Sequence, residues 1–254
     1  MRTLDLDKVS EFVNKHIAAF YDMQWESLKN ITLDQLLEGK NPYLLRTKPS
    51  QSAGQWVTSL LNEYLSSSEE KHFGDFLERL AIFVAGETCG GHKSTAQGVD
   101  LEFVDDDVHY VVSIKSGTSW GNSSQVAKLV EDMKRAKIRV RQSRTASKVQ
   151  PVLGICYGKT RTNFNYRFPG FWKVVGQNFW YLISENRGLY TDIVEPIGYR
   201  AKQHNEAFEA ELDSIVNRFT GAFIERFCTP SGAIDWERLV AFNSGNFDLG
   251  AAIP

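Results

Sequence analysis

Two extended segments joined by three aspartates restrict the fold of this chain more than any other feature. Residues 99–104 and 108–116 are rich in β-branched and aromatic side chains that alternate with polar ones, and the aspartates at 105–107 separate them. Alternation on both sides of a short polar turn is typical of a β-hairpin. We therefore expect a hairpin in the middle of the chain, with one face directed toward a hydrophobic core.

The length of the turn decides which side chains of this hairpin share a face. A two-residue turn at 106–107 places Asp100 opposite Ser113. Because side chains alternate along a strand, Glu102 and Lys115 then point to the same side as this pair. The other face is expected to consist of apolar residues, namely Val99, Leu101, Phe103, Tyr110, Val112 and Ile114.

The polar face of the hairpin carries the side chains that hydrolysis of a phosphodiester needs. Mg²⁺ prefers oxygen ligands and is held by one or two carboxylates with water and phosphate oxygens, so Asp100 is the expected anchor. Lys115 is expected to orient or deprotonate the attacking water and to stabilise the charge that develops on the phosphate. A lysine at the end of an apolar strand also fits an acidic partner or plain solvent, and the pattern alone leaves these alternatives open.

Helical segments lie on both sides of the hairpin in the chain. Six segments are expected to be helices, at residues 5–38, 52–65, 67–84, 124–141, 203–227 and 235–242. Ser67 and Glu70 have capping-box spacing at the start of the third. A buried strand is expected at 149–158, and a further strand near 179–183. This order predicts an α/β fold with a mixed sheet core flanked by helices, and with added N- and C-terminal helices.

Three regions follow from this order. Residues 1–65 form an N-terminal helical region, residues 66–200 the α/β core with its loops, and residues 201–254 a C-terminal helical region. A loop punctuated by two prolines is expected at 40–51. The length suits one integrated domain made of these regions.

The composition excludes several classes of protein. The chain has 29 Lys and Arg against 31 Asp and Glu, a net charge of −2, so contact with nucleic acid has to come from local clusters of charge. No apolar run has the ~18 residues that a membrane span needs, and the first residues do not resemble a signal peptide. Three widely spaced cysteines form neither a disulfide framework nor a zinc motif, so we expect a cytoplasmic protein.

The hairpin sequence resembles the motif of the PD-(D/E)xK nuclease superfamily. In GVDLEF followed by YVVSIKSG, Asp100 and Lys115 match the acidic residue and the lysine of that motif, and Val99 stands where the superfamily often has proline. Ser113 stands where Asp or Glu is usual. This departure removes one metal ligand and leaves the number of metal ions open.

The resemblance implies that a carboxylate from elsewhere replaces the missing ligand. GDFLERLA resembles a G-x-x-x-E-R helix found upstream in related nucleases, so Glu78 is the first candidate and Glu102 the second. On a helical wheel Glu78 lies off the apolar stripe, whereas Glu69 and Glu70 lie nearer to it and stay open as alternatives. The expected catalytic residues are Asp100, Lys115, Ser113 and Glu78, and the expected Mg²⁺ ligands are Asp100, Ile114, Glu78 and Glu102.

A longer block resembles the PmeII-like family of type II restriction endonucleases. The strings KNPYLLR, SSSEEKHFGDFLERLAIFV, GGHKST-x-x-GVDLEF and SIKSGTSWGNSSQ carry this resemblance over residues 40–125, and VLGICYGK extends it to Lys159. It implies a homodimer that uses Mg²⁺ to cut double-stranded DNA at a short palindrome, leaving 5′-phosphates. It also implies a cognate methyltransferase as functional companion.

Three segments near the hairpin are candidates for contact with DNA. The loop GTSWGNSSQ opens a helix whose N-terminal amides favour anions, although an ordinary capping loop has the same pattern. Residues 128–148 carry eight Lys and Arg against two acids, as either a phosphate-tracking patch or a solvated helix face. GKTRTNFNYRFPGFW either enters a DNA groove or packs on the core through its aromatics. The expected DNA-contacting residues are Lys93, Ser116, Trp120, Asn122, Ser123, Ser124, Gln125, Lys159, Arg161 and Arg167.

These observations leave three hypotheses for the function. The first is a type II restriction endonuclease, and the second is a repair or junction-resolving nuclease with the same core. The third is a DNA-binding protein without catalysis, because loss of a metal ligand at Ser113 is one way in which a nuclease becomes a binder. Retention of both Asp100 and Lys115 favours the nucleases.

Overall fold

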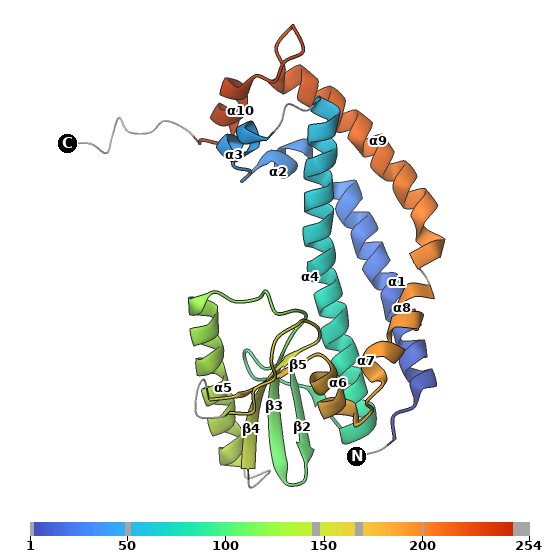
Figure 1. The fold of residues 1–254 in the computed structure, drawn as a ribbon, viewed down its shortest axis with the longest axis vertical. Helices are drawn as coiled ribbons and strands as arrows, with labels where there is room; N and C mark the ends of the chain where they lie inside the picture. The colour runs from blue at the N-terminus through green and yellow to red at the C-terminus, as the bar shows by residue number, and fades with distance from the viewer. Residues whose placement is uncertain (1–2, 49–51, 144–147, 166–169, 200, 246–254) are drawn as a thin grey trace, which may run out of the picture. The chain divides into compact units, whose positions relative to one another are not determined.

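The computed structural model describes residues 3–48, 52–143, 148–165, 170–199 and 201–245 (Figure 1). Arg144 and Arg167, from the segments expected near DNA, lie outside these ranges. The chain forms two compact units, one of residues 1–20 and 71–202 and the other of residues 21–70 and 203–254. The beginning of the chain therefore belongs with the α/β core, whereas the sequence analysis places it in a separate helical region.

The first unit is built on a five-stranded mixed sheet whose strands lie in chain order. The strands are β1 (His92–Lys93), β2 (Leu101–Asp105), β3 (Val108–Lys115), β4 (Lys148–Ile155) and β5 (Trp172–Val175). β1, β2 and β3 pair antiparallel, β4 is parallel to β3, and β5 is parallel to β4. Helix α5 (Ser123–Ser143) provides the crossover that the parallel pair of β3 and β4 requires. The predicted α/β fold with a mixed sheet core is confirmed, although β1 and β5 were not expected.

The hairpin of β2 and β3 has the register that a two-residue turn predicts. Asp105 pairs with Val108, and Asp106 and Asp107 have φ angles of 45° and 61°. A type I′ turn needs this left-handed backbone, which aspartate adopts more readily than most residues. The pairing continues to Asp100, whose N–H donates to a β3 carbonyl at 2.8 Å.

Helix α5 covers the face of the sheet that carries the predicted site (Figure 1). Its buried side chains pack in one cluster with Val111, Leu153 and Ile155. By strand alternation, Ser113 and Lys115 lie on this same face. The face that the sequence analysis assigns to polar residues therefore also has an apolar part, which anchors the helix.

The opposite face packs against α6 (Gln177–Ser184), whose Phe179 ring lies directly over the backbone of Gly154 in β4. Val99 was expected on this opposite face beside Leu101, and that prediction is wrong. Val99 packs in the cluster beneath α5. The reason is that it precedes β2 and its N–H bonds to the carbonyl of Ala96, so strand alternation does not extend to it.

The other helices of the described ranges are α1 (Leu6–Asn30), α2 (Leu33–Leu37), α3 (Pro42–Thr47), α4 (Ala53–Cys89), α7 (Leu189–Asp192), α8 (Val194–Tyr199), α9 (Ala201–Phe227) and α10 (Trp236–Phe242). The predicted helix at 5–38 is interrupted because Thr32 forms a capping box with Gln35 and begins α2. The loop expected at 40–51 contains α3, whose N-cap is Asn41.

Two further predictions of secondary structure are wrong. The helices expected at 52–65 and 67–84 are one helix of 37 residues, α4, so Ser67 and Glu70 lie inside it and cap nothing. The strand expected near 179–183 is α6, which buries Phe179 and Ile183, four residues apart, on one face. A short apolar run is compatible with either structure, and tertiary packing decides between them.

The second unit has its own hydrophobic core, formed by the end of α1, the first part of α4, and α2, α9 and α10. Within it the rings of Phe223 and Phe227 lie 5.5 Å apart, and Arg226 pairs with Asp34. Apart from the alternatives Glu69 and Glu70, the residues predicted for catalysis, metal binding or DNA contact belong to the first unit. No helix in the described part of the chain is both long and apolar enough to cross a bilayer.

Candidate active site

Asp100 is held at the start of β2 by two donors from β3. Its Oδ2 accepts a hydrogen bond from the Ile114 N–H at 2.6 Å and one from the Ser113 hydroxyl at 3.3 Å. Within the described ranges Oδ1 accepts no hydrogen bond from the protein. The carboxylate is therefore fixed in orientation and keeps one oxygen for another ligand, while the buried Ser113 acts as a donor to it.

Lys115 ends β3 two residues after Ser113, on the same face as that hydroxyl. Its Nζ lies 5.8 Å from the centroid of the Trp120 ring, in a cation–π contact. Trp120 was expected to touch DNA, and the structure places its ring against the lysine. The contact limits the positions that the ammonium group adopts.

Glu78 is brought toward this end of the sheet by the packing of α4. At Gly74, one turn earlier, a Cβ atom would lie only 3.5 Å from the Ser116 hydroxyl, so the helix approaches the end of β3 closely. Lys93 of β1 pairs with Glu78, with 3.3 Å between Nζ and Oε1. Burial raises the pKa of the Cys156 thiol, and the charge of Glu78 raises it further.

The three alternatives to Glu78 lie in different surroundings. Glu69 and Glu70 are exposed and belong to the second unit. Glu102 is buried, and its carboxylate accepts hydrogen bonds from Ser94, His109 and Arg139. These donors occupy both oxygens, so Glu102 is engaged within the protein.

The Glu102 cluster ties β2 to the segment that precedes Asp100. Burial by itself would raise the pKa of Glu102, but hydrogen bonds from Ser94, His109 and Arg139, with the charge of Arg139, outweigh it and lower the pKa. Arg139 also donates to the Thr95 hydroxyl at 3.1 Å. The Arg139 guanidinium therefore holds Thr95 directly and Ser94 through Glu102. These two residues precede Asp100, the candidate metal ligand, by five and six positions.

The loop after Lys115 has the capping geometry that was one of its two interpretations. Asn122 Oδ1 accepts from the Gln125 N–H at 3.0 Å, and Gln125 Oε1 accepts from the Asn122 N–H at 2.9 Å. The Ser124 hydroxyl donates to Asn122, while Ser123 is exposed at the first position of α5. Contact of this loop with DNA stays a prediction.

The basic segment at 128–148 is partly used for internal ion pairs. Arg139 binds Glu102, and Arg135 pairs with Glu131 at 2.7 Å. Four cations of the described part of the segment are exposed and form no ion pair with another described residue, namely Lys128, Lys134, Arg141 and Lys148. The patch is therefore smaller than the sequence suggests.

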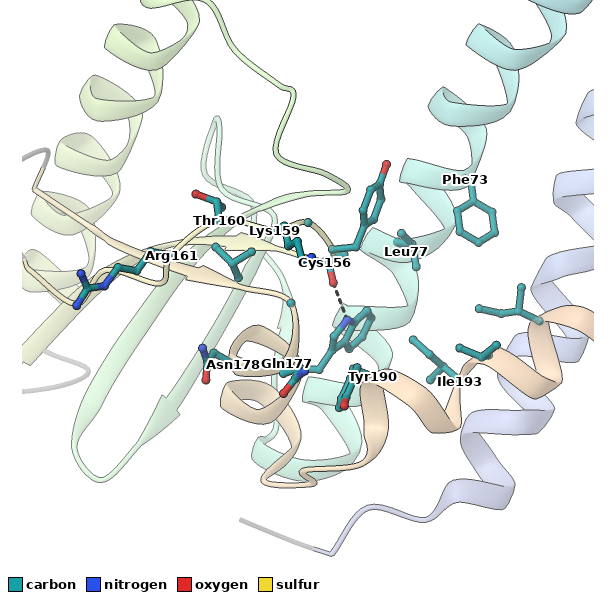
Figure 2. Close-up of a pocket in the computed structure, with 17 residues that line it drawn as sticks. Phe73, Leu77, Cys156, Lys159, Thr160, Arg161, Gln177, Asn178, Tyr190 and Ile193 are labelled. Carbon is teal, nitrogen blue, oxygen red and sulfur yellow. Dashed lines mark hydrogen bonds between the residues drawn. The ribbon is translucent and has the colours of Figure 1, made fainter.

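The segment after β4 is held in part by its aromatic side chains, which was one of its two interpretations, and its entry into a DNA groove stays a prediction. Phe164 packs edge-on against Trp172 at 5.2 Å between centroids, as expected for a loop fixed by its aromatics. Lys159 and Arg161 are exposed and line a cavity (Figure 2). Two tyrosines of that cavity, Tyr157 and Tyr190, were missed from the sequence, because no local pattern indicates that α7 lies beside the end of β4.

The donors at this end of the sheet fit Mg²⁺. In the described ranges no group of three or more His, Cys, Asp or Glu side chains is arranged to hold a metal. Mg²⁺ does not require such a group, because it keeps several waters and takes one or two carboxylates. Asp100 keeps Oδ1 uncommitted for such an ion, whereas Glu78, the other predicted carboxylate, pairs with Lys93.

The mixed sheet with its flanking helices is the α/β fold of restriction-endonuclease-like proteins. The model of the family described as type II restriction endonuclease EcoO109I matches residues 7–205. The chain therefore belongs to this family of type II restriction endonucleases, which are nucleases. The match does not confirm the PmeII-like assignment. No curated protein matches the chain.

Proposed function

We propose that this protein makes Mg²⁺-dependent double-strand cuts at a short palindromic DNA site. The observation that carries the proposal is the Asp100 carboxylate, held by the Ile114 amide on the strand that ends in Lys115. A carboxylate and an ammonium group are thereby presented at one end of one hairpin. The family match to type II restriction endonucleases supports DNA as the substrate.

In the proposed mechanism Asp100 and Glu78 would hold the metal together with the main chain at Ile114. The bound ion supplies charge neutralisation at the phosphate and acidifies water. Ser113 keeps the carboxylate of Asp100 in position through its hydroxyl. Lys115 orients the attacking water or, as the neutral amine, takes up its proton, and as the ammonium it stabilises charge on the phosphate. The water oxygen bonds to phosphorus as the P–O3′ bond breaks, and the 3′-oxygen takes a proton from solvent, so that a 5′-phosphate and a 3′-hydroxyl remain.

The wider setting of the proposal follows from the family. A palindromic site is cut in both strands most simply by two copies of one chain, so we infer a homodimer. A cognate methyltransferase is the expected companion, since a cell that holds such a nuclease must protect its own sites. We infer a cytoplasmic location from the same requirement for access to DNA.

The test is cleavage of phage DNA by the purified chain in Mg²⁺. We expect discrete fragments from the wild type and a loss of activity of at least about a hundredfold in Asp100→Asn. Mutation of residues that only support a metal ligand already costs up to about a hundredfold in activity, and loss of the ligand itself costs no less. Glu131→Gln, a neutralised exposed acid on α5, is the matched control and should cut normally. A smear, cutting of branched DNA alone, or equal activity in Asp100→Asn contradicts the proposal.

A further inference from the structure

A cavity of about 750 Å³ opens in the first unit beside the candidate active site (Figure 2). It lies between the end of β4, the segment that follows it, and helices α4, α6, α7 and α8. Its volume is within the range of pockets that hold small organic ligands, about 300–1,000 Å³. None of its lining residues belongs to the proposed catalytic set.

One side of the cavity is apolar and aromatic. Leu77, Trp180 and Ile193 are buried beneath it. The indole of Trp180 is fixed because its Nε1–H donates to the Cys156 carbonyl at 3.0 Å, the bond drawn in Figure 2. The Tyr190 ring is 38% exposed at the mouth and is accessible to a ligand. A planar aromatic group fits such a surface.

The other side of the cavity is polar and positive. Lys159 and Arg161 line it together with the amides of Gln177 and Asn178, and Figure 2 shows Arg161 and Asn178 across the cavity from Ile193. No acidic residue is among the described residues that line it. In a chain with a net charge of −2, two cations without an anion favour a negatively charged ligand.

The cavity is next to the strand that carries the candidate lysine. The Cys156 N–H donates to the Lys115 carbonyl and the Tyr157 N–H to the Ser116 carbonyl, both at 2.9 Å. Neighbouring strands lie about 4.8 Å apart. The cavity therefore lies beside the carboxyl end of β3, whose last residue is Lys115.

We propose that this cavity binds a nucleotide, with the base on the side of Trp180, Tyr190 and Ile193 and the phosphate at Lys159 and Arg161. An unstacked nucleotide of a DNA strand and a free nucleotide share this chemistry. The position beside Lys115 favours the DNA strand, a choice that rests on the proposed nuclease function. The binding itself does not depend on it.

The experiment measures binding by the full chain without divalent metal, so that cleavage has no part in it. The probes are a fluorescein-labelled single-stranded octanucleotide, followed by anisotropy, and free dAMP, followed by calorimetry. Tyr190→Ala removes a stacking surface, and we expect about a five- to hundredfold weaker affinity for the oligonucleotide. Lys159→Gln should lower the slope of log affinity against log salt by about 0.7.

Two matched controls change the same residue types elsewhere in the first unit. Tyr181→Ala changes an exposed tyrosine of α6 outside the cavity, and Lys15→Gln an exposed lysine of α1, so both should bind as the wild type does. Val194→Trp fills the mouth from a position that is 64% exposed, which keeps the fold intact, and should weaken binding like Tyr190→Ala.

The outcomes separate the two sources and the two proposals. Weakened oligonucleotide binding with no detectable dAMP binding assigns the cavity to a DNA strand, whereas dAMP binding that Tyr190→Ala weakens assigns it to a free nucleotide. Equal affinity of the wild type, Tyr190→Ala and Val194→Trp for both probes overturns the inference. If the protein fails to cut DNA but its variants show these losses of affinity, the cavity proposal stands and the proposed nuclease function is refuted.

Discussion

Replacing Glu102 with glutamine separates a structural carboxylate from a metal ligand. In the structure one oxygen accepts from Ser94 and Arg139, and the other lies 2.9 Å from His109 Nε2. Glutamine has one acceptor oxygen, which can serve either Ser94 and Arg139 or His109 but not both sets, and it carries no charge. A hydrogen bond to a charged group contributes about 1.5–3 kcal/mol, and the Arg139 side chain is 43% exposed, which screens its share.

We therefore expect Glu102→Gln to lower the free energy of unfolding by about 2 kcal/mol and the midpoint of thermal unfolding by about 4–8 °C. Circular dichroism at pH 7 measures this. Glu131→Gln removes a carboxylate whose side chain is 66% exposed on α5, and its free energy of unfolding should stay within about 0.5 kcal/mol of the wild type. The Mg²⁺ concentration needed for cutting should not change in Glu102→Gln.

The pH dependence of the same variant gives an independent check. The pKa of Glu102 is lower in the folded protein than its ordinary value. The stability that this carboxylate contributes is therefore present above the unfolded pKa, about 4.3, and is lost as the pH falls through the folded pKa. The difference between wild type and Glu102→Gln should shrink below that pH. An unchanged midpoint together with a raised Mg²⁺ requirement would refute the structural role.

Three further predictions concern stability and reactivity. Gly98→Ala should destabilise the protein to urea by about 1–3 kcal/mol, because φ is +73° and a Cβ would lie 2.4 Å from Asp132 Oδ2, whereas Gly90→Ala at φ +69° has open space and should cost less. Cys156 should resist thiol reagents in the native protein up to pH 9, since burial and then the Glu78 charge raise the pKa of its thiol; labelling before unfolding refutes this. Thr32→Ala should cost about 1 kcal/mol in urea unfolding by removing the capping box of α2, and an unchanged midpoint contradicts that role.

The hairpin was predictable because its signals are local. The aspartate turn sets the register, the register sets which residues face each other, and Asp100 meets Ser113 as the sequence indicates. The prediction fails for Val99, one residue earlier, because the chain has left the strand there.

The roles of the two candidate glutamates were not predictable in the same way. Glu102 lies on the expected face, but its partner Arg139 comes from α5, 37 residues away, and no pattern in the sequence joins them. Glu78 was suggested by resemblance alone, and only the packing of Gly74 on Ser116 brings its part of α4 to the end of the sheet.

The serine at position 113 has a consequence for how DNA approaches. A second aspartate there would add a negative charge beside Asp100, and like charges a few ångströms apart repel both each other and an incoming polyanion. The neutral hydroxyl spares the protein that repulsion. Binding of the duplex therefore depends less on a cation that is already bound at Asp100, so DNA can be recognised before the metal ion binds.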